Sequence, residues 1–423
     1  MVRIRFAPSP TGFLHLGNAR IAVVNALFAR RHGGAFVLRI DDTDTARSDE
    51  AYTAAIREDL SWLGLRRDEE YRQSEHGEVY EGAFERLVTS GAVYACTETG
   101  PELAAWRRER SRPAYKPGVL PGGGGPAYWR FALGHERLGF TDLVLGERPV
   151  DLGSLSDPVV RRADGSFTYL FASAVDDVTL GITHVIRGAD HVTNTGTQIR
   201  IARALDAPEP AFAHLPLVLG PDGEGLSKRH GSLSLRELRA RGVEPLAIVQ
   251  LLAALGTDTA ADPAADLDRL AVTLDLAGYG HASPRLDPVD LERQSAEVVR
   301  RLPWTAVGHR LPGLIDEPFW HAVRANLDRV EDALDWWRVV HESMEPRIED
   351  AAFLQLAADL LPDPVDFDTW VVALKRATGR KGRELFHPLR LALTGRERGP
   401  ELKVLLAVLP RDRALGRLRG QIA

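Results

Sequence analysis

The chain has 423 residues, of which 44% are hydrophobic and 26% charged, a composition that is ordinary for a globular protein of roughly two to four domains. Its 59 acidic and 53 basic residues give a net charge of −6, so the overall charge does not indicate nucleic-acid binding, although local basic surface can still hold a large anionic partner. The single cysteine, Cys96, excludes an internal disulfide and a cysteine-cluster zinc site, and we expect it to be a small buried hydrophobic residue.

The N-terminus lacks the basic-then-apolar pattern of a signal peptide. The longest apolar stretch, residues 245–256, is interrupted by Gln250 and is too short to span a bilayer. We therefore expect a cytoplasmic protein without a membrane partner.

The beginning of the chain alternates between strand and helix patterns. Short apolar runs at residues 2–6 and 36–40 predict strands, and apolar positions at helical spacing predict a helix over residues 18–31 between them. Gly33-Gly34 ends this helix. The alternation favours an α/β fold with a parallel sheet, whose ligands bind beyond the carboxyl ends of its strands.

The loop after the first predicted strand is suited to bind an anion. It reads Ala7-Pro8-Ser9-Pro10-Thr11-Gly12-Phe13-Leu14-His15-Leu16-Gly17-Asn18 and leads into a helix, whose first N–H groups and positive end attract negative charge. A second signature, Leu226-Ser227-Lys228-Arg229-His230-Gly231, places a lysine in a Gly-rich loop, where it could meet a leaving polyphosphate. Together the two signatures indicate chemistry on a nucleoside triphosphate.

A change of composition near residue 87 predicts an insertion. Residues 106–116 are rich in arginine, and residues 121–126 read Pro-Gly-Gly-Gly-Gly-Pro, which we interpret as a hinge. The α/β pattern resumes near Val159, and after Gly231 the chain is mainly helical.

These segments together resemble class I aminoacyl-tRNA synthetases. The two signatures are similar to the HIGH and KMSKS motifs of that family, and the wording Arg5-Phe6-Ala7-Pro8-Ser9-Pro10-Thr11-Gly12 resembles its bacterial-type glutamyl branch. Further segments are similar to that branch and follow its order: Leu38-Arg39-Ile40-Asp41-Asp42-Thr43-Asp44, Asp164-Gly165-Ser166-Phe167-Thr168-Tyr169, Val175-Asp176-Asp177, residues 183–188 and residues 378–395. The resemblance covers essentially the whole chain.

The resemblance implies a domain organisation. A Rossmann-type parallel-sheet catalytic domain would span residues 1–86 and 158–230, and an inserted connective, acceptor-binding subdomain would span residues 87–157. A helical stem-contact domain at 231–300 and an α-helical anticodon-binding region at 301–423 would follow. The family favours a monomer. Some members carry zinc near the position of Cys96, but a single thiolate cannot build that site, so no structural zinc or other bound metal is expected.

The resemblance also implies the activity, which is ligation of L-glutamate to tRNA through an adenylate made from ATP, with Mg²⁺ accompanying the ATP. The attacking carboxylate is already ionised, so the reaction needs positioning and hydrogen-bond donors rather than a general base. A turn histidine and a solvated loop lysine are the alternative roles for the two expected catalytic residues, His15 and Lys228. The ATP contacts implied by the family are His15, Gly17, Asn18, Leu226, Ser227, Lys228 and Arg229.

An anionic amino acid requires cationic partners, and arginine can bind a carboxylate through two parallel hydrogen bonds. The structural alternative for Arg5 and Arg187 is a strand-end salt bridge, for instance with Asp41 or Asp190, and we favour the binding role. The glutamate contacts implied by the family, in which Asp41 holds the α-ammonium group, are Arg5, Ala7, Ser9, Asp41, Tyr169, Ser173 and Arg187. For Asp42-Thr43-Asp44, capping of the following helix is as well supported as a functional role.

Basic residues in the insertion and in the helical end are candidates for contact with tRNA. Phosphate contacts would position the acceptor stem, and base contacts would read the splayed anticodon. A run of charge is more often a solvated face, but the resemblance gives a binding role to Arg107, Arg110, Lys375, Arg380 and Lys381. The expected partner is tRNA-Glu, and charging of tRNA-Gln stays open.

Two other functions stay open. Truncated glutamyl-queuosine relatives modify tRNA-Asp, but they lack an anticodon-binding end, whereas this chain has a long helical one. A non-catalytic tRNA-binding paralog is suggested by three departures from the family pattern: Gly225, where a lysine often stands, Ser173 and Ala189. The Ala-Pro-Ser-Pro opening argues against a glutaminyl synthetase.

Overall fold

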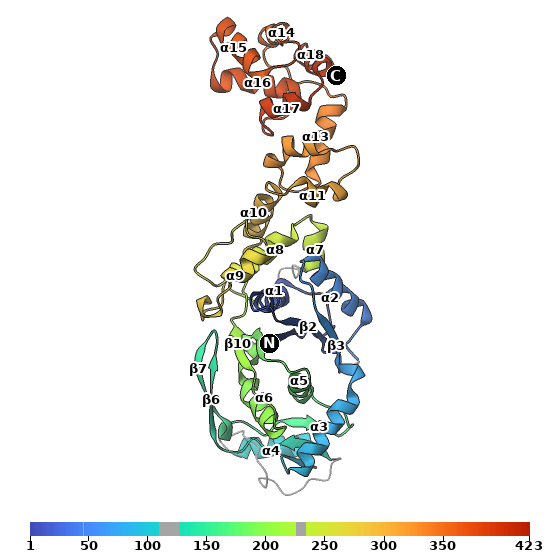
Figure 1. Ribbon diagram of the computed structural model, residues 1–423, viewed down its shortest axis with the longest axis vertical. Helices are drawn as coiled ribbons and strands as arrows, with labels where there is room; N and C mark the ends of the chain where they lie inside the picture. Colours follow the sequence, from blue (N-terminus) through green and yellow to red (C-terminus); the bar gives the residue numbers. More distant parts are fainter. Residues whose placement is uncertain (45, 110–126, 226–233) are drawn as a thin grey trace. The chain divides into compact units, whose positions relative to one another are not determined.

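The computed structural model describes residues 1–44, 46–109, 127–225 and 234–423. It contains two compact units, one of residues 1–240 and 248–288 and the other of residues 241–247 and 289–423. In the described residues the first unit combines strands with helices, and the second consists of helices and their connections (Figure 1). The predicted α/β class with a helical C-terminal end is confirmed.

The strands all belong to the first unit, as far as the described residues show. They are β1 (Arg3–Phe6), β2 (Ala35–Ile40), β3 (Glu69–Arg72), β4 (Val93–Cys96), β5 (Tyr128–Phe131), β6 (Arg137–Asp142), β7 (Gly146–Asp151), β8 (Val159–Arg161), β9 (His184–Gly188) and β10 (Ala211–Leu215). The helices up to residue 273 are α1 (Leu16–Arg31), α2 (Glu50–Trp62), α3 (Gly77–Thr89), α4 (Gly100–Glu109), α5 (Tyr169–Thr179), α6 (Val192–Ala204), α7 (Leu235–Ala240), α8 (Pro245–Ala254) and α9 (Leu267–Thr273).

Seven of these strands form the main sheet within the described residues, in the order β3-β2-β1-β9-β10-β6-β7. Neighbours pair in parallel except for the β6–β7 hairpin at one edge. Strand β1 pairs with β2 on one side, where Arg3 lies opposite Ala35, and with β9 on the other, where Ile4 lies opposite His184. The strand order reverses between β1 and β9, which is where sheets of this kind bind ligands.

Helix α1 connects the neighbouring strands β1 and β2. It begins at Leu16, two positions before the predicted start at residue 18, because the side chain of His15 caps its first turn. It ends at Arg31, and Gly33 then takes a φ of +56°, the left-handed conformation that favours glycine. Helix α1 lies on one side of the sheet, and α5 and α6 lie on the other (Figure 1).

The segment expected to be an insertion, residues 87–157, contributes strands to two sheets of the first unit. Its hairpin β6–β7 joins the main sheet through the parallel pair β6–β10, in which Asp142 lies opposite Phe212. Its strands β4 and β5 instead form a small antiparallel sheet with β8, which starts at Val159, beyond the expected boundary at residue 157. The expected insertion therefore contributes a hairpin directly to the sheet that carries the ligand crevice.

The apolar stretch at residues 245–256 forms α8, and its side chains Ala247, Ile248, Val249 and Leu252 are buried. Apolar burial within the protein therefore accounts for this run. Within the described ranges, no helix combines the length and the apolar character that a bilayer-spanning segment needs.

The second unit is built around one helical core. Trp320 and Trp370 are fully buried in it, and their indole N–H groups donate to the backbone oxygens of Leu302 and Ala357. Buried tryptophans contribute large apolar area, and these hydrogen bonds avoid the cost of an unpaired N–H group. The helices of the second unit are α10 (Pro288–Val299), α11 (Trp304–Val307), α12 (Glu317–Val323), α13 (Asp332–His341), α14 (Ala351–Asp359), α15 (Phe367–Thr378), α16 (Gly382–Thr394), α17 (Leu402–Val408) and α18 (Arg411–Leu418).

Candidate active site

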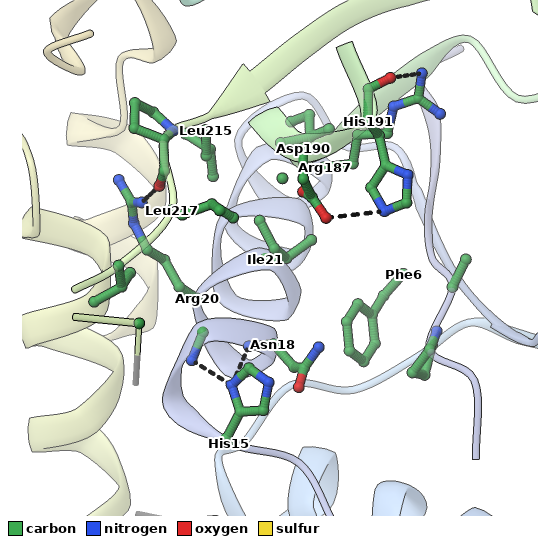
Figure 2. Close-up of a pocket in the computed structure, with 18 of the residues that line it drawn as sticks. Phe6, His15, Asn18, Arg20, Ile21, Arg187, Asp190, His191, Leu215 and Leu217 are labelled. Atoms are coloured by element: carbon green, nitrogen blue, oxygen red, sulfur yellow. Dashed lines mark hydrogen bonds and ion pairs between the residues drawn. The ribbon is translucent and has the colours of Figure 1, made fainter. Parts of the chain in front are cut away.

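A cavity of about 400 Å³ lies in the first unit where β1, β9 and β10 reach their carboxyl ends. Its lining comes from within residues 5–8, 15–21, 186–191 and 215–219, with Tyr169 and Gly225 completing it. These segments are far apart in the sequence and meet because the sheet order reverses at this point. Figure 2 shows the side chains around the cavity, among them Phe6, His15, Asn18, Arg187 and Asp190.

His15 occupies the N-cap position of α1. Its Nδ1 accepts hydrogen bonds from the backbone N–H groups of Gly17, at 3.1 Å, and Asn18, at 3.4 Å (Figure 2). Because Nδ1 is an acceptor, the proton of the neutral ring resides on Nε2. Burial lowers the pKa of His15 below its usual 6.5, which keeps the ring neutral at physiological pH. The residue thus offers an Nε2–H donor beside the positive end of a helix.

Gly17 makes room for the His15 ring. A Cβ at this position would lie 2.9 Å from Cε1 and 3.0 Å from Nδ1 of His15, closer than real contacts allow. The glycine is therefore required for the cap itself, in addition to the close ligand approach expected from the sequence.

Arg187, at the end of β9, is a buried cation whose hydrogen-bond partners are all neutral. Its Nε donates to His214 Nε2 at 3.0 Å, and its Nη2 donates to Thr195 Oγ1 at 2.9 Å. The same Nη2 donates to the backbone oxygen of His191 at 3.3 Å (Figure 2). Within the described residues its Nη1 is buried without a partner. Burial and the nearby positive charge of Arg5 lower the pKa of Arg187 to about 10, so the group is still protonated at neutral pH. The expected salt-bridge alternative with Asp190 does not occur for this residue.

Arg5, at the end of β1, does form a salt bridge, although with a residue that the sequence did not suggest. Its Nε lies 2.9 Å from Asp177 Oδ1 and its Nη2 lies 3.4 Å from Oδ2, and both side chains are buried. Arg5 also lines the cavity, so its expected contact with glutamate stays a prediction. Asp177 also accepts from Arg39, so one carboxylate supports two buried arginines.

Arg39 holds two residues that were expected to contact glutamate. It donates to both carboxylate oxygens of Asp41, at 2.6 and 3.0 Å, and to Ser173 Oγ at 2.9 Å. Neither Asp41 nor Ser173 is among the residues that line the cavity. Burial raises the pKa of Asp41 to about 6, against the opposing effect of the Arg39 guanidinium. The sequence placed Asp41 at the correct edge of the sheet but did not indicate its partner.

The other expected glutamate contacts divide in the same way. Ala7 and Tyr169 line the cavity, and burial raises the pKa of the Tyr169 hydroxyl. Ser9 is exposed and lies outside the lining. Arg20, which was not among the expected contacts, also lines the cavity (Figure 2). Its Nη1 and Nη2 donate to the backbone oxygens of Pro216 and Leu255, so it joins α1 to two loops.

Helix capping by Asp42 and Asp44, the structural role considered for them, does not occur. The N-cap of α2 is Asp49, whose side chain accepts from the N–H of Ala51. Asp42 instead accepts from Arg72 and from the backbone and hydroxyl of Ser74, and these contacts lower its pKa although burial opposes them.

Several expected contacts lie outside the described residues. These are the ATP contacts Leu226, Ser227, Lys228 and Arg229, and the tRNA contact Arg110. Arg107 lies in α4, a helix of the first unit. Gly225, directly before the second signature, lines the cavity.

The basic residues of the second unit have different surroundings. Arg380 donates to Asp350 Oδ2 at 2.6 Å and stacks over the ring of Phe353, so its side chain packs against the start of α14. Lys375 and Lys381 are exposed at the end of α15 and before α16. Of these three expected tRNA contacts, Lys375 and Lys381 present their charge to solvent, and Arg380 is held by Asp350 and Phe353.

Sequence reasoning missed the residues that orient the two arginines of the cavity. Asp177 and Arg39 stood in recognised motifs without an assigned role. Asp142, Thr195 and His214 were not singled out, and their only signal was the occurrence of polar side chains among apolar strand and helix positions. Such a signal does not reveal which distant side chain is the partner.

The cavity as a whole favours an anionic ligand. Its lining contains Arg5 and Arg187 at the strand ends and the helix N-terminus at His15, while Asp190 is its only carboxylate among the described lining residues. Guanidinium groups and helix N-terminal N–H groups bind carboxylates and phosphates. The geometry therefore suits a small acidic molecule together with a phosphate group.

Two family models match the chain. Residues 1–265 match the model described as tRNA synthetases class I (E and Q), catalytic domain, and residues 351–422 match the model described as Anticodon binding domain. Within the described residues, no group of three or more His, Cys, Asp or Glu side chains is arranged to hold a metal ion.

The chain is also similar to individual proteins over its whole length. It is 48% identical to Glutamate--tRNA ligase 2 of Methylorubrum populi, over 99% of each chain, and 48% identical to Glutamate--tRNA ligase 1 of Rhodospirillum rubrum, over 100% of this chain and 99% of the other. The crystal structure of a glutamate tRNA ligase from Elizabethkingia meningosepticum, in complex with its amino acid, matches with a TM-score of 0.80 and 26% identity, over 99% of this chain and 98% of that one.

Proposed function

Because this chain belongs to the family of class I tRNA synthetases for glutamate and glutamine, we propose that it is a glutamate–tRNA ligase. It joins L-glutamate to the 3′-terminal adenosine of tRNA-Glu at the expense of ATP. The chain keeps the residues that this chemistry requires in the described part of the cavity, and this argues against a non-catalytic paralog. Its match to an anticodon-binding domain at residues 351–422 argues against the truncated glutamyl-queuosine relatives.

The observation that carries the choice of substrate is the buried guanidinium of Arg187. Its hydrogen-bond partners are neutral and one nitrogen is unpaired among the described residues, so a positive charge without a direct ion pair lies at the wall of the cavity. A buried charge without a direct ion pair is costly, and a ligand carboxylate that pairs with it lowers that cost. The neutral amide of glutamine offers no such charge, so this site favours glutamate.

In the first step, an oxygen of the glutamate α-carboxylate forms a bond to the α-phosphorus of ATP, and the bond between that phosphorus and the bridging oxygen of pyrophosphate breaks. The Nε2–H of His15 donates to the phosphate oxygens as their charge increases, and the positive end of α1 beside it stabilises the same charge. Gly17 and Asn18 place the same helix end against the nucleotide. Mg²⁺ accompanies the ATP as part of the substrate, and Lys228 and Arg229 bind the leaving pyrophosphate, with Leu226 and Ser227 contacting the nucleotide.

In the second step, a ribose hydroxyl of the terminal adenosine attacks the carbonyl carbon of the adenylate, and AMP leaves. The region 87–157, with Arg107 and Arg110, contacts the acceptor end, and residues 231–300 contact the stem. The region 301–423, with Lys375 and Lys381, binds the anticodon arm. We expect the protein to work as a monomer in the cytoplasm.

The test is charging of purified tRNA-Glu, tRNA-Gln and tRNA-Asp with labelled glutamate and ATP. Label on tRNA-Glu, alone or with tRNA-Gln, supports the proposal and settles the acceptor range. Label on tRNA-Asp alone identifies a modifying enzyme, and no label on any of the three identifies a binding protein. A Lys228→Ala variant serves as a control, because it should slow adenylate formation far more than it weakens tRNA binding.

A further inference from the structure

A chain of three buried side chains leads away from the cavity behind Arg187. Asp142 Oδ2 lies 2.5 Å from His214 Nδ1, and His214 Nε2 accepts from Arg187 Nε at 3.0 Å. Asp142 lies in β6, His214 in β10 and Arg187 in β9, and β10 lies between the other two strands in the sheet. Asp142 and His214 are both at most 2% exposed, so the chain is closed to solvent.

The direction of these hydrogen bonds fixes the tautomer of His214. An arginine N–H can only donate, so Nε2 must be the acceptor and the ring proton must reside on Nδ1. That proton points at the carboxylate of Asp142, which can only accept when it is ionised. The pKa of Asp142 is lowered by His214 and by the backbone N–H groups of Leu145 and Val144, although burial opposes the shift. Asp142 therefore fixes the orientation and tautomer of His214, and His214 in turn fixes the position of Arg187 Nε.

The carboxylate of Asp142 is itself held by the backbone. Its Oδ1 accepts from the N–H groups of Val144 at 2.9 Å, Leu145 at 2.8 Å and His214 at 3.2 Å, so only Oδ2 faces the imidazole. The hairpin β6–β7 thus provides a fixed anchor beside the cavity.

The remaining surroundings of His214 are either aromatic or uncharged at neutral pH. The ring stacks on Phe212, with the edge of Phe140 near it, and Thr195 Oγ1 lies 3.2 Å from Nε2. The charged and titratable groups that face it are Asp142 from β6, Arg187 from β9 and, more weakly, His191. Burial lowers the pKa of His214, so the imidazole stays neutral.

We propose that His214, oriented by Asp142, is a positioning residue that directs the Arg187 guanidinium at the side-chain carboxylate of the amino-acid substrate. The neutral imidazole holds Nε of Arg187 in place without cancelling its charge. Arg5 shows the contrast, because a direct salt bridge to Asp177 compensates its charge within the protein. The inference rests on the proposed function and adds the residues that give the site its preference for glutamate.

The test uses Asp142→Asn, an isosteric change that reverses the tautomer. The three backbone N–H groups keep the amide oxygen at the Oδ1 position, so the amide NH₂ faces His214 and donates to Nδ1. The ring proton then moves to Nε2, where it opposes the N–H of Arg187. We expect KM for glutamate in tRNA-dependent ATP–pyrophosphate exchange to rise about 10- to 100-fold, since a hydrogen bond to a charged group is lost, while KM for ATP stays within about 2-fold.

A second pair of variants keeps the test independent of Asp142. His214→Leu removes the acceptor and should raise KM for glutamate similarly, whereas His214→Gln can place its amide oxygen near the Nε2 position and should recover most of the loss. The matched control is Asp59→Asn, the same change at a buried carboxylate of α2 that does not line the cavity, and it should leave both KM values unchanged.

The outcomes separate the two proposals. A wild-type protein that does not activate glutamate overturns the proposed function. An active wild-type protein whose Asp142→Asn variant keeps its KM for glutamate overturns the positioning role, as does His214→Gln behaving like His214→Leu. A rise in KM for glutamate and ATP together indicates general disruption of the cavity and counts against the inference.

Discussion

The guanidinium of Arg39 binds both carboxylate oxygens of Asp41, with Nε 2.6 Å from Oδ1 and Nη2 3.0 Å from Oδ2. Arg39 also donates to Asp177 and Ser173, and it is completely buried. The acidic residue expected to hold the substrate ammonium group is therefore already oriented by the protein. A substrate ammonium at Asp41 would have to share its oxygens with Arg39.

Asp177 is predicted to be the residue of this cluster whose charge matters most for stability. It accepts from both Arg5 and Arg39, so Asp177→Asn leaves two buried cations with less compensation. We expect the free energy of unfolding of the wild type to exceed that of the variant by about 3–5 kcal/mol, measured by urea denaturation at pH 7.

The pH dependence of stability provides a second test of Asp177→Asn. The pKa of Asp177 is lowered by Arg5 and Arg39 against the effect of burial, so its folded value lies below the unfolded 3.8. The contribution of Asp177 to the free energy of unfolding is present above pH 4 and is lost on further acidification. The difference in unfolding free energy between wild type and variant should therefore shrink below pH 4. Asp268→Asn, which breaks the exposed pair with Arg30, is the control and should not change the midpoint measurably. Equal effects of the two substitutions would contradict the buried-cluster argument.

His15 is predicted to have two separable roles. His15→Ala removes the cap of α1, which should cost about 1 kcal/mol of unfolding free energy, and removes the Nε2–H donor, which should lower the exchange rate about 100- to 1000-fold. His15→Asn keeps a capping oxygen, so it should restore stability but not activity. Recovery of activity by asparagine would mean that the cap alone is important.

Asp59 is predicted to destabilise the folded protein at neutral pH. It is buried in α2 with Oδ2 unpaired among the described residues, and burial raises its pKa to about 6, above the unfolded 3.8. The protonated form is the stable one in the fold, so the stability that Asp59 contributes below pH 4 is lost as the pH rises through 6. Asp59→Asn should therefore be more stable than the wild type by about 1–3 kcal/mol at pH 8, and the gain should vanish near pH 4, measured by thermal unfolding across this range. A gain that does not depend on pH would exclude titration of this carboxyl as its cause.

The basic residues near the end of the chain should separate into binding and structural groups. Lys381→Ala should weaken binding of tRNA and reduce its dependence on salt without changing stability, because the side chain is exposed. Arg380→Ala should lower the stability of the second unit, because it breaks the contacts with Asp350 and Phe353. Binding titrations over a range of salt concentrations, with thermal unfolding of both variants, would check the division. It fails if Arg380→Ala changes binding and leaves stability intact.

The sequence alone determined the features that depend on residues close together in the chain. The order of strands and helices follows from apolar spacing, and the placement of His15 at the start of α1 follows from a strand, a loop and a helix within a few residues. The two signatures and their resemblance gave the family, because each motif is a local arrangement of residues.

Only the tertiary structure decided which distant side chains became partners. Arg5 pairs with Asp177, 172 positions away, and Asp142 reaches His214, 72 positions away. These contacts depend on strand order, and the composition of the predicted insertion did not indicate that its hairpin β6–β7 pairs with β10. Apolar periodicity determines which face of a strand is buried but not which strand becomes its neighbour. The partners of Arg5 and Arg187 could therefore be read only from the assembled sheet.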